Sequence, residues 1–152
     1  MTQEEYNQLD LDFAHCAGNY CAKADECLRH TAYTMLASSK SETYTMVNSA
    51  LITGAQSCPF FMPDRKERFA WGISKIYDNV RAADLRLVRD NVMSYFGTGV
   101  YYKMKQQRRV ITEREQQLIR QSFTEMGYDG SSISFDRYEE QYPALMPLSG
   151  KK

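Results

Sequence analysis

The stretch "TEREQQLIRQSFTEMG" at residues 112–127 carries the clearest structural signal in the chain, and the expected fold is built around it. Thr112 and Glu115 form a capping box, which is the signature of a helix N-terminus. Apolar residues then recur at helical spacing on one face: Leu118, Ile119 and Phe123. Gly127 stands where a helix typically ends. The stretch therefore predicts a capped amphipathic helix.

Moving outward, four more stretches have helical periodicity. They are "ADECLRHTAYTMLASS" (24–39), "PDRKERFAWGISKIYDNV" (63–80), "AADLRLVRDNVMSYF" (82–96) and "VYYKMKQQRR" (100–109). Asp25 is the expected N-cap of the first, and Pro63 suits the first turn of the second. Short β-strands are expected at 43–48 or 133–135 at most. The chain is therefore predicted to be mainly α.

The chain has 152 residues, 43% hydrophobic and 25% charged, which are ordinary values for one globular domain. We expect a single domain, 1–152, of about five helices with a loop-rich, cysteine-bearing N-terminal third. Its expected parts are a metal-site segment (1–62), a helical core with a basic face (63–128) and an acidic tail packed on that core (129–152). The acidic N-terminus lacks the basic flank and apolar stretch of a signal peptide. No apolar run approaches the roughly 20 residues of a membrane span, so we expect a cytoplasmic protein without membrane contact.

The four cysteines are crowded toward the N-terminus: Cys16, Cys21, Cys27 and Cys58. Structural disulfides are rare in the cytosol, whereas four thiolates complete the first shell of a zinc ion or an iron–sulfur cluster. One straight helix cannot gather the first three, because Cys21 would point about 140° away from Cys16. We therefore expect this segment to loop, with Cys58 joining from a distance. The expected ion is zinc, and the alternative is an iron–sulfur cluster.

Three other interpretations of these residues stay open. The first is that the four cysteines are reduced, buried and purely structural, as free cysteines often are. His15 and His30 are alternate metal ligands, although a histidine beside the site is the simpler role for each. Cys27 and His30 also form a candidate nucleophile and base, but no third orienting residue stands out, so an enzyme is less favoured than a binding module.

Residues 65–120 contain 13 Lys and Arg against 6 Asp and Glu. Within this region, aromatic and basic side chains interleave over 101–120, in an outline that suits a helix-turn-helix. The candidate contacts for an anionic partner are Tyr101, Tyr102, Lys103, Lys105, Arg108 and Arg109. They suit phosphate neutralisation and base stacking in a nucleic acid, or contact with an acidic protein. The alternative is a solvated basic face that pairs with the acidic ends, since the net charge is zero.

Several stretches together resemble a small family of uncharacterised, four-cysteine cytosolic proteins from Bacteroidales. They are "AHCAGNYCAKADECLRH", "CPFF", "RKERFAWGI", "YYK", "ITEREQQLIRQSF" and "FDRYEEQY". The resemblance covers nearly the whole chain and implies one domain in a bacterial cytosol. The family carries no assigned activity, so the resemblance adds no mechanism. The function expected from the residues is a metal-stabilised binding module; an iron–sulfur or redox protein and a thiol enzyme are the alternatives.

Overall fold

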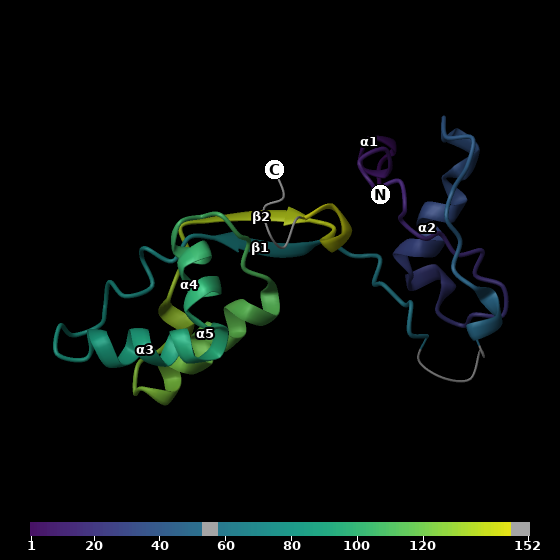
Figure 1. The fold of residues 1–152 in the computed structure, drawn as a ribbon. Helices are drawn as coiled ribbons and strands as arrows, with labels where there is room; N and C mark the ends of the chain where they lie inside the picture. The colour runs from purple at the N-terminus through teal and green to yellow at the C-terminus, as the bar shows by residue number, and fades with distance from the viewer. Residues whose placement is uncertain (53–57, 147–152) are drawn as a thin grey trace. The chain divides into compact units, whose positions relative to one another are not determined.

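The computed structural model describes residues 1–52 and 58–146 and divides the chain into two compact units (Figure 1). The N-terminal unit is Met1–Arg65 and the C-terminal unit is Lys66–Lys152, and each is described by itself. The described residues form five α-helices and one two-stranded sheet. None of the helices in this part of the chain is long and apolar enough to cross a membrane.

The N-terminal unit contains two short α-helices, α1 (Gln3–Tyr6) and α2 (Leu28–Thr34). Single 3-10 turns add Ala24–Glu26, Leu36–Ser38 and Ser49–Leu51. The helix predicted over 24–39 is therefore broken, and Asp25 is not its N-cap. The break falls at Cys27, whose extended backbone (φ −109°, ψ 123°) forms an antiparallel bridge with Pro63. That pairing ends the first turn and starts α2 one residue later.

The strand predicted at 43–48 is reduced to an isolated parallel bridge between His15 and Met46. The His15 N–H donates to the Thr45 carbonyl and the Val47 N–H to the His15 carbonyl, both at 2.8 Å. The β-forming residues thus find a partner, but for one residue pair only. The consequence is that His15 is fixed in the interior of the N-terminal unit, with 6% of its surface exposed.

The C-terminal unit is built from the antiparallel ribbon β1 (Glu67–Trp71) and β2 (Arg137–Gln141), paired from Glu67 opposite Gln141 to Trp71 opposite Arg137. Three α-helices lie to one side of this ribbon: α3 (Leu85–Phe96), α4 (Thr98–Lys105) and α5 (Glu113–Glu125) (Figure 1). Two 3-10 turns, Gly130–Ser132 and Pro143–Leu145, complete it. Val88, Val92, Ile119 and Phe123 are buried in one core with Ala70 of β1, whereas Leu85 at the start of α3 is exposed.

The helix predicted over 63–80 is wrong. Strand β1 occupies residues 67–71 of this range, and a series of turns follows Gly72. Phe69, Ile73 and Ile76 have the spacing of one helix face and are all buried, but Phe69 lies on the strand and the two isoleucines lie in the segment after it. The reason is tertiary: β1 is paired on one edge by β2, and Ala70 exchanges two backbone hydrogen bonds with Ile111 on the other. A backbone paired on both edges is extended whatever the local periodicity.

The possible strand at 133–135 is displaced in a similar way, because β2 begins at Arg137. Ile133 and Phe135 instead enter the main core as buried side chains ahead of the strand. The helix beginning at Glu113 is confirmed in detail. Thr112 accepts from the Glu115 N–H while the Glu115 carboxylate accepts from the Thr112 N–H, and Gly127 follows with φ +83°.

Candidate functional site: a cavity lined by the cysteines

All four cysteines line one small cavity in the N-terminal unit. They come from separate places: a loop for Cys16, a turn for Cys21, the break before α2 for Cys27, and the segment before Met62 for Cys58. All four are free thiols; Cys27 is buried and the others are half-buried. Cys58 thus borders the same cavity as the three earlier cysteines.

The cavity is small and its remaining wall is largely apolar. Its volume is about 10 Å³, which is about the space for one water molecule. The other lining residues are Gly18, Ala24, Arg29, His30, Ile52, Phe60 and Phe61. Among the residues that the structure describes, no three Cys, His, Asp or Glu side chains are gathered at metal-binding geometry. The thiols thus surround a common space without forming a closed ligand cluster.

His30 joins the cysteines at this cavity, in a defined orientation. Its Nδ1 lies 3.1 Å from the Cys16 carbonyl oxygen. A carbonyl only accepts hydrogen bonds, so Nδ1 is the protonated nitrogen and Nε2 carries a lone pair. A histidine that donates one ring N–H to a backbone carbonyl has the arrangement typical of a metal ligand. No hydrogen bond joins His30 to Cys27 within the described residues, so the nucleophile–base pair is not assembled here.

Arg29 ties together the segments around the cavity. Its Nε donates to the Phe60 carbonyl and its Nη1 to the Ala14 carbonyl, both at 2.9 Å. The guanidinium also lies over the Phe13 ring, 5.1 Å from its centroid. One side chain therefore links the chain before Cys16 to the chain after Cys58, and it belongs to a residue that also lines the cysteine cavity.

Gly18 allows the loop to approach α2 closely. Its φ is +73°, and an added Cβ would lie 2.7 Å from His30 Nδ1 and 2.9 Å from the Ala24 Cβ. Only glycine combines this backbone conformation with that contact. The segment between Cys16 and Cys21 therefore turns at Gly18, and this turn brings the loop into contact with His30.

His15, the other alternate ligand, does not line the cysteine cavity. Its Nε2 lies 3.0 Å from the Tyr6 hydroxyl and its Nδ1 lies 3.2 Å from the Thr45 carbonyl oxygen. The carbonyl requires a protonated Nδ1, so Nε2 accepts from the tyrosine. Both nitrogens are occupied, and the rings of Tyr6, Phe13 and Tyr44 contact the imidazole edge-on. His15 is a structural histidine with satisfied hydrogen bonds.

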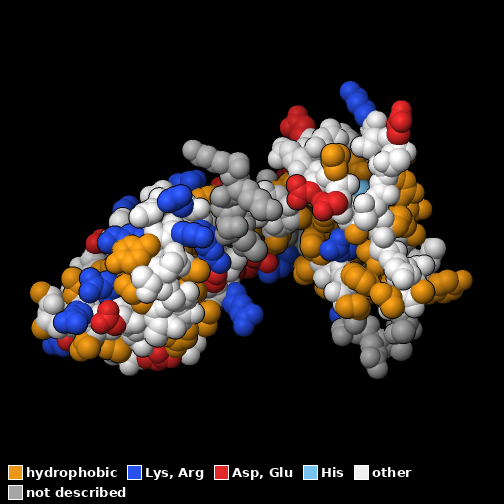
Figure 2. Space-filling view, viewed as in Figure 1, with side chains coloured by type: hydrophobic (Ala, Val, Ile, Leu, Met, Phe, Trp, Pro, Cys, Tyr) orange, Lys and Arg blue, Asp and Glu red, His pale blue; other side chains and the backbone are white. Residues whose placement is uncertain are grey.

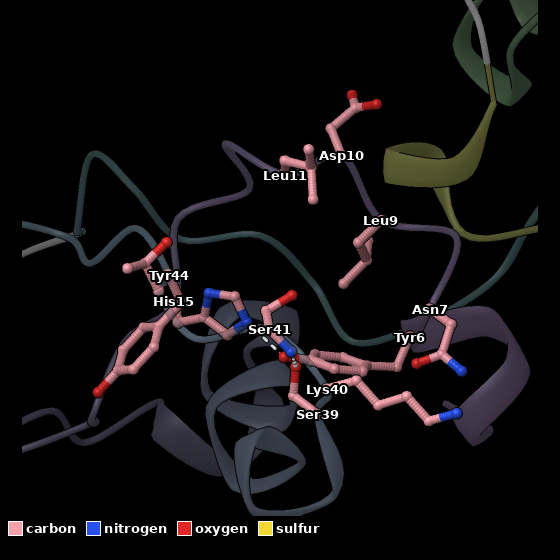
Figure 3. Close-up of a pocket in the computed structure, with 11 residues that line it drawn as sticks. Tyr6, Asn7, Leu9, Asp10, Leu11, His15, Ser39, Lys40, Ser41 and Tyr44 are labelled. Atoms are coloured by element: carbon pink, nitrogen blue, oxygen red, sulfur yellow. Dashed lines mark hydrogen bonds between the residues drawn. The ribbon is translucent and has the colours of Figure 1, made fainter.

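A second cavity, of about 290 Å³, opens beside His15 and Tyr6 (Figure 3). Leu9 points toward this pair, while Asp10 points away from it. Ser39, Lys40 and Ser41 lie across from α1 and complete much of the wall. No sequence motif marks this cavity, because its residues come from an irregular segment and one short helix.

Of the six residues predicted to contact an anionic partner, some are exposed and others are buried or already paired within the protein. Tyr101 is only 2% exposed and its hydroxyl lies 2.9 Å from that of Tyr77. Burial also raises the pKa of Tyr101. Tyr101 is thus unable to stack on a base, which corrects the prediction for this residue. Tyr102, Lys103, Lys105 and Arg108 are exposed.

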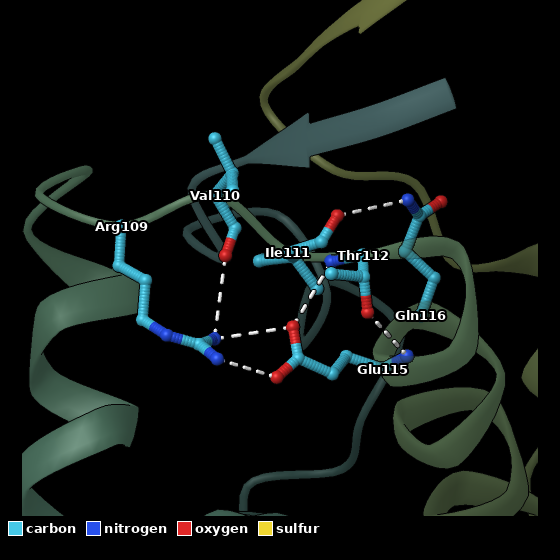
Figure 4. A network of polar contacts seen from close by, with 6 residues as sticks. All are labelled: Arg109, Val110, Ile111, Thr112, Glu115 and Gln116. Carbon is cyan, nitrogen blue, oxygen red and sulfur yellow. Dashed lines mark hydrogen bonds and ion pairs between the residues drawn. The ribbon is translucent and has the colours of Figure 1, made fainter. Parts of the chain in front are cut away.

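Arg109 is engaged by Glu115 (Figure 4). Nη1 and Nη2 reach the two carboxylate oxygens at 3.1 and 2.7 Å, and both side chains are largely buried, at 16% and 17% exposure. The same carboxylate closes the capping box on the Thr112 N–H at 3.0 Å. Arg109 therefore stabilises the start of α5. The prediction that Arg109 contacts an anionic partner is corrected, because its guanidinium is already paired with Glu115.

A groove on the C-terminal unit was not predicted. It has a volume of about 430 Å³ and lies between β1, β2 and α5; its lining is Arg68, Glu113, Arg114, Gln116, Gln117, Arg120 and Tyr138. Figure 2 shows Lys and Arg side chains scattered over the visible face of this unit, and hydrophobic side chains over much of that of the N-terminal unit. Arg114 and Arg120 were within the basic region, but Arg68 and Tyr138 are brought to them only by the fold.

The fold and the cysteine cavity define a small, largely helical protein with a thiol-lined cavity. The chain belongs to the Family of unknown function (DUF6078), which matches residues 1–144. No curated protein matches the chain. No solved structure matches it either.

Proposed function

We propose that the protein is a metal-stabilised binding module, with a structural zinc ion held by Cys16, Cys21, Cys27 and Cys58. One observation carries the proposal: the chain's four cysteines, the last of them 31 residues after the third, line a single cavity. Four thiolates complete a tetrahedral zinc site with sulfur at about 2.3 Å. The thiols would have to close on the ion, because no three metal-binding side chains in the described part of the chain stand at ligand geometry.

The surroundings of the cavity also suit a bound cation. Ala24, Ile52, Phe60 and Phe61 exclude water from one side, and unpaired thiolates in such a wall would be costly. A zinc ion with four thiolates has a net charge of about −2, which the Arg29 guanidinium offsets in part. His30, with its free Nε2, is an alternate fourth ligand. Closing the ligands on the ion would fasten the loop before α2 to the segment near Met62.

The size of the cavity favours zinc over an iron–sulfur cluster. A volume of about 10 Å³ holds one atom-sized group, whereas a cluster of several iron and sulfide ions would have to displace Phe60 or Phe61. The cluster remains the alternative ligand of the same cysteines. A thiol enzyme is the third candidate, and it has least support because His30 is bonded to a carbonyl and not to a thiol.

Elemental analysis and absorption spectroscopy of protein purified without oxygen test the proposal. We expect about one zinc per chain, a colourless solution, and a lowered Tm after a strong chelator is added. Cys27→Ser and Cys58→Ser should each lose the metal, whereas His15→Gln should retain it. A brown protein that contains iron and sulfide would show that the cofactor is an iron–sulfur cluster and not zinc. A metal-free protein whose Tm is indifferent to zinc and to chelator would overturn both.

For the binding role, we propose that the exposed basic side chains after α3 contact an anionic partner, a nucleic acid or an acidic protein. Four of the six predicted residues support this: Tyr102, Lys103, Lys105 and Arg108. Lys105 Nζ lies 5.9 Å from the Tyr102 ring centroid, so charge and an aromatic face occur together. Binding to a single-stranded oligonucleotide should weaken with salt and with Lys103→Gln and Lys105→Gln together. Binding that ignores salt would exclude phosphate contact.

We place this module in the cytoplasm of a bacterium, in a Bacteroidales family whose members share the four cysteines. Free thiols at all four positions are in keeping with a reducing compartment.

A further inference from the structure

We propose that the groove between β1, β2 and α5 binds a small phosphate ester. This inference uses the C-terminal unit alone and does not depend on the metal. The groove is lined by Arg68, Arg114 and Arg120 and by one carboxylate, Glu113. The balance of charge is about +2, which matches the dianion of a phosphate monoester at neutral pH.

None of the three arginines forms an ion pair with a carboxylate in the described part of the chain. Arg120 Nη1 is held by neutral partners only, the carbonyl oxygens of Gly130 at 2.9 Å, Ile133 at 3.0 Å and Ser131 at 3.3 Å. These bonds fix the guanidinium without neutralising it. Its other nitrogens are free of described partners, so they can donate to an oxyanion.

Arg68 is also held in place. Its guanidinium carbon lies 4.0 Å from the Tyr138 ring centroid, and its backbone N–H donates to the Glu113 carboxylate at 2.9 Å. That carboxylate is therefore committed to the backbone at the edge of the groove. Two arginines fixed before binding reduce the entropy that a ligand must remove, and they favour a specific site over a diffuse surface charge.

Gln116 supplies an independent polar anchor. The side chain is 7% exposed, and its Nε2 donates to the carbonyls of Arg68 and Ile111 at 2.7 and 3.1 Å. No described residue donates to its Oε1, although the residue lines the groove. A ligand that pairs with the arginines and with this acceptor needs a hydroxyl or N–H group as well as a phosphate. The groove volume is in the range of small-molecule sites, and far below the track that a nucleic-acid strand requires.

The test is titration of the full chain with glycerol 3-phosphate at constant ionic strength, followed by calorimetry and by amide NMR shifts. Inorganic phosphate and glycerol are the comparison ligands, and a single-stranded oligothymidylate is the polymeric one. We expect glycerol 3-phosphate to bind more tightly than inorganic phosphate, glycerol not to bind, and the shifts to centre on residues 113–120.

The decisive variant is Arg114→Gln, because the Arg114 side chain is exposed and makes no described contact that the fold needs. We expect it to weaken glycerol 3-phosphate binding at least tenfold with no change in Tm. Arg86→Gln is the matched control, an exposed arginine of α3 outside the groove, and it should leave binding unchanged. Equal weakening by both variants, or no effect of Arg114→Gln, would overturn the proposal. So would an oligonucleotide that binds more tightly than glycerol 3-phosphate and depends on Arg114.

Discussion

The His30 imidazole donates from Nδ1 to the carbonyl oxygen of Cys16 at 3.1 Å. This bond joins a residue of α2 to the loop that carries the first cysteine, and it leaves Nε2 of this cavity-lining residue without a hydrogen-bond partner among the described residues. The position of His30 therefore separates two roles, that of a ligand through Nε2 and that of a support for the loop through Nδ1.

Two substitutions of His30 distinguish these roles. Asn at this position retains a donor near Nδ1 and has nothing in place of Nε2, whereas Ala removes both. If His30 supports the loop, His30→Ala should reduce zinc affinity about 10- to 100-fold and His30→Asn much less. Competition with a chromophoric chelator measures both affinities. Equal loss in the two variants would instead make Nε2 a ligand, and His15→Gln serves as a control whose zinc affinity should not change.

Arg109 and Glu115 should stabilise the C-terminal unit measurably. Their bidentate pair is mostly shielded from solvent, so a double-mutant cycle with Ala should give a coupling free energy of about 1–2 kcal/mol. Arg86 and Asp90 on α3 are the matched pair: their side chains are 86% and 55% exposed and 3.9 Å apart. Their coupling should be below about 0.5 kcal/mol. Urea unfolding of the two cycles gives both values, and similar values would contradict the argument from burial.

Gly72→Ala should be far more damaging than Gly127→Ala. Both glycines have positive φ, +76° and +83°, so both substitutions carry a backbone cost of about 1 kcal/mol. A Cβ at Gly72 would also lie 2.7 Å from the Asp136 Cγ, whereas nothing lies within 4 Å at Gly127. Asp136 has little freedom to turn away, because the Ser74 hydroxyl donates to it at 2.7 Å. We expect a loss of about 3 kcal/mol or more for Gly72→Ala in the free energy of unfolding.

The C-terminal unit should lose stability in alkaline solution. Burial, and for Tyr77 the hydrogen bond with Tyr101, raises the pKa of both tyrosines above the ordinary value of 10.0. Above that pH the unfolded chain releases protons that the folded chain retains, so the free energy of unfolding falls as pH rises. Urea unfolding between about pH 8 and pH 11 should show the decline. Replacing Tyr77 and Tyr101 together by Phe should make it shallower, and an unchanged slope would exclude these two groups as its cause.

The sequence predicted those parts of the fold that depend on local interactions. The helix after Thr112 follows from a capping box and an apolar stripe, and both are present. Phe69, Ile73 and Ile76 have helical spacing, which predicts a helix where strand β1 lies. The backbone of β1 is extended because it pairs with Ile111 and with β2. Pairing partners at such distances leave no trace in local periodicity.

The candidate site shows the same division. Clustering of the cysteines in the sequence favoured a shared site, and all four line one cavity, but the metal site itself stays a prediction. The clustering could not separate His30, which lines the cavity, from His15, which does not, because both stand next to the same cysteines in the sequence. The groove lined by arginines could not be predicted from the sequence either. Arg68 and Arg120 are 52 residues apart in the chain, and only the fold brings both to one groove.

The β1–β2 ribbon also constrains how this protein can be made. Trp71 Nε1 donates to Glu139, 68 residues later in the chain. On the ribosome, the residues of the cysteine cavity emerge first, before any strand of the ribbon. Strand β1 emerges next and has no β2 to pair with until β2 has been synthesised. A ribosome that stalls between the two strands therefore exposes an unpaired strand whose side chains are partly buried in the fold, and such a strand is prone to aggregation.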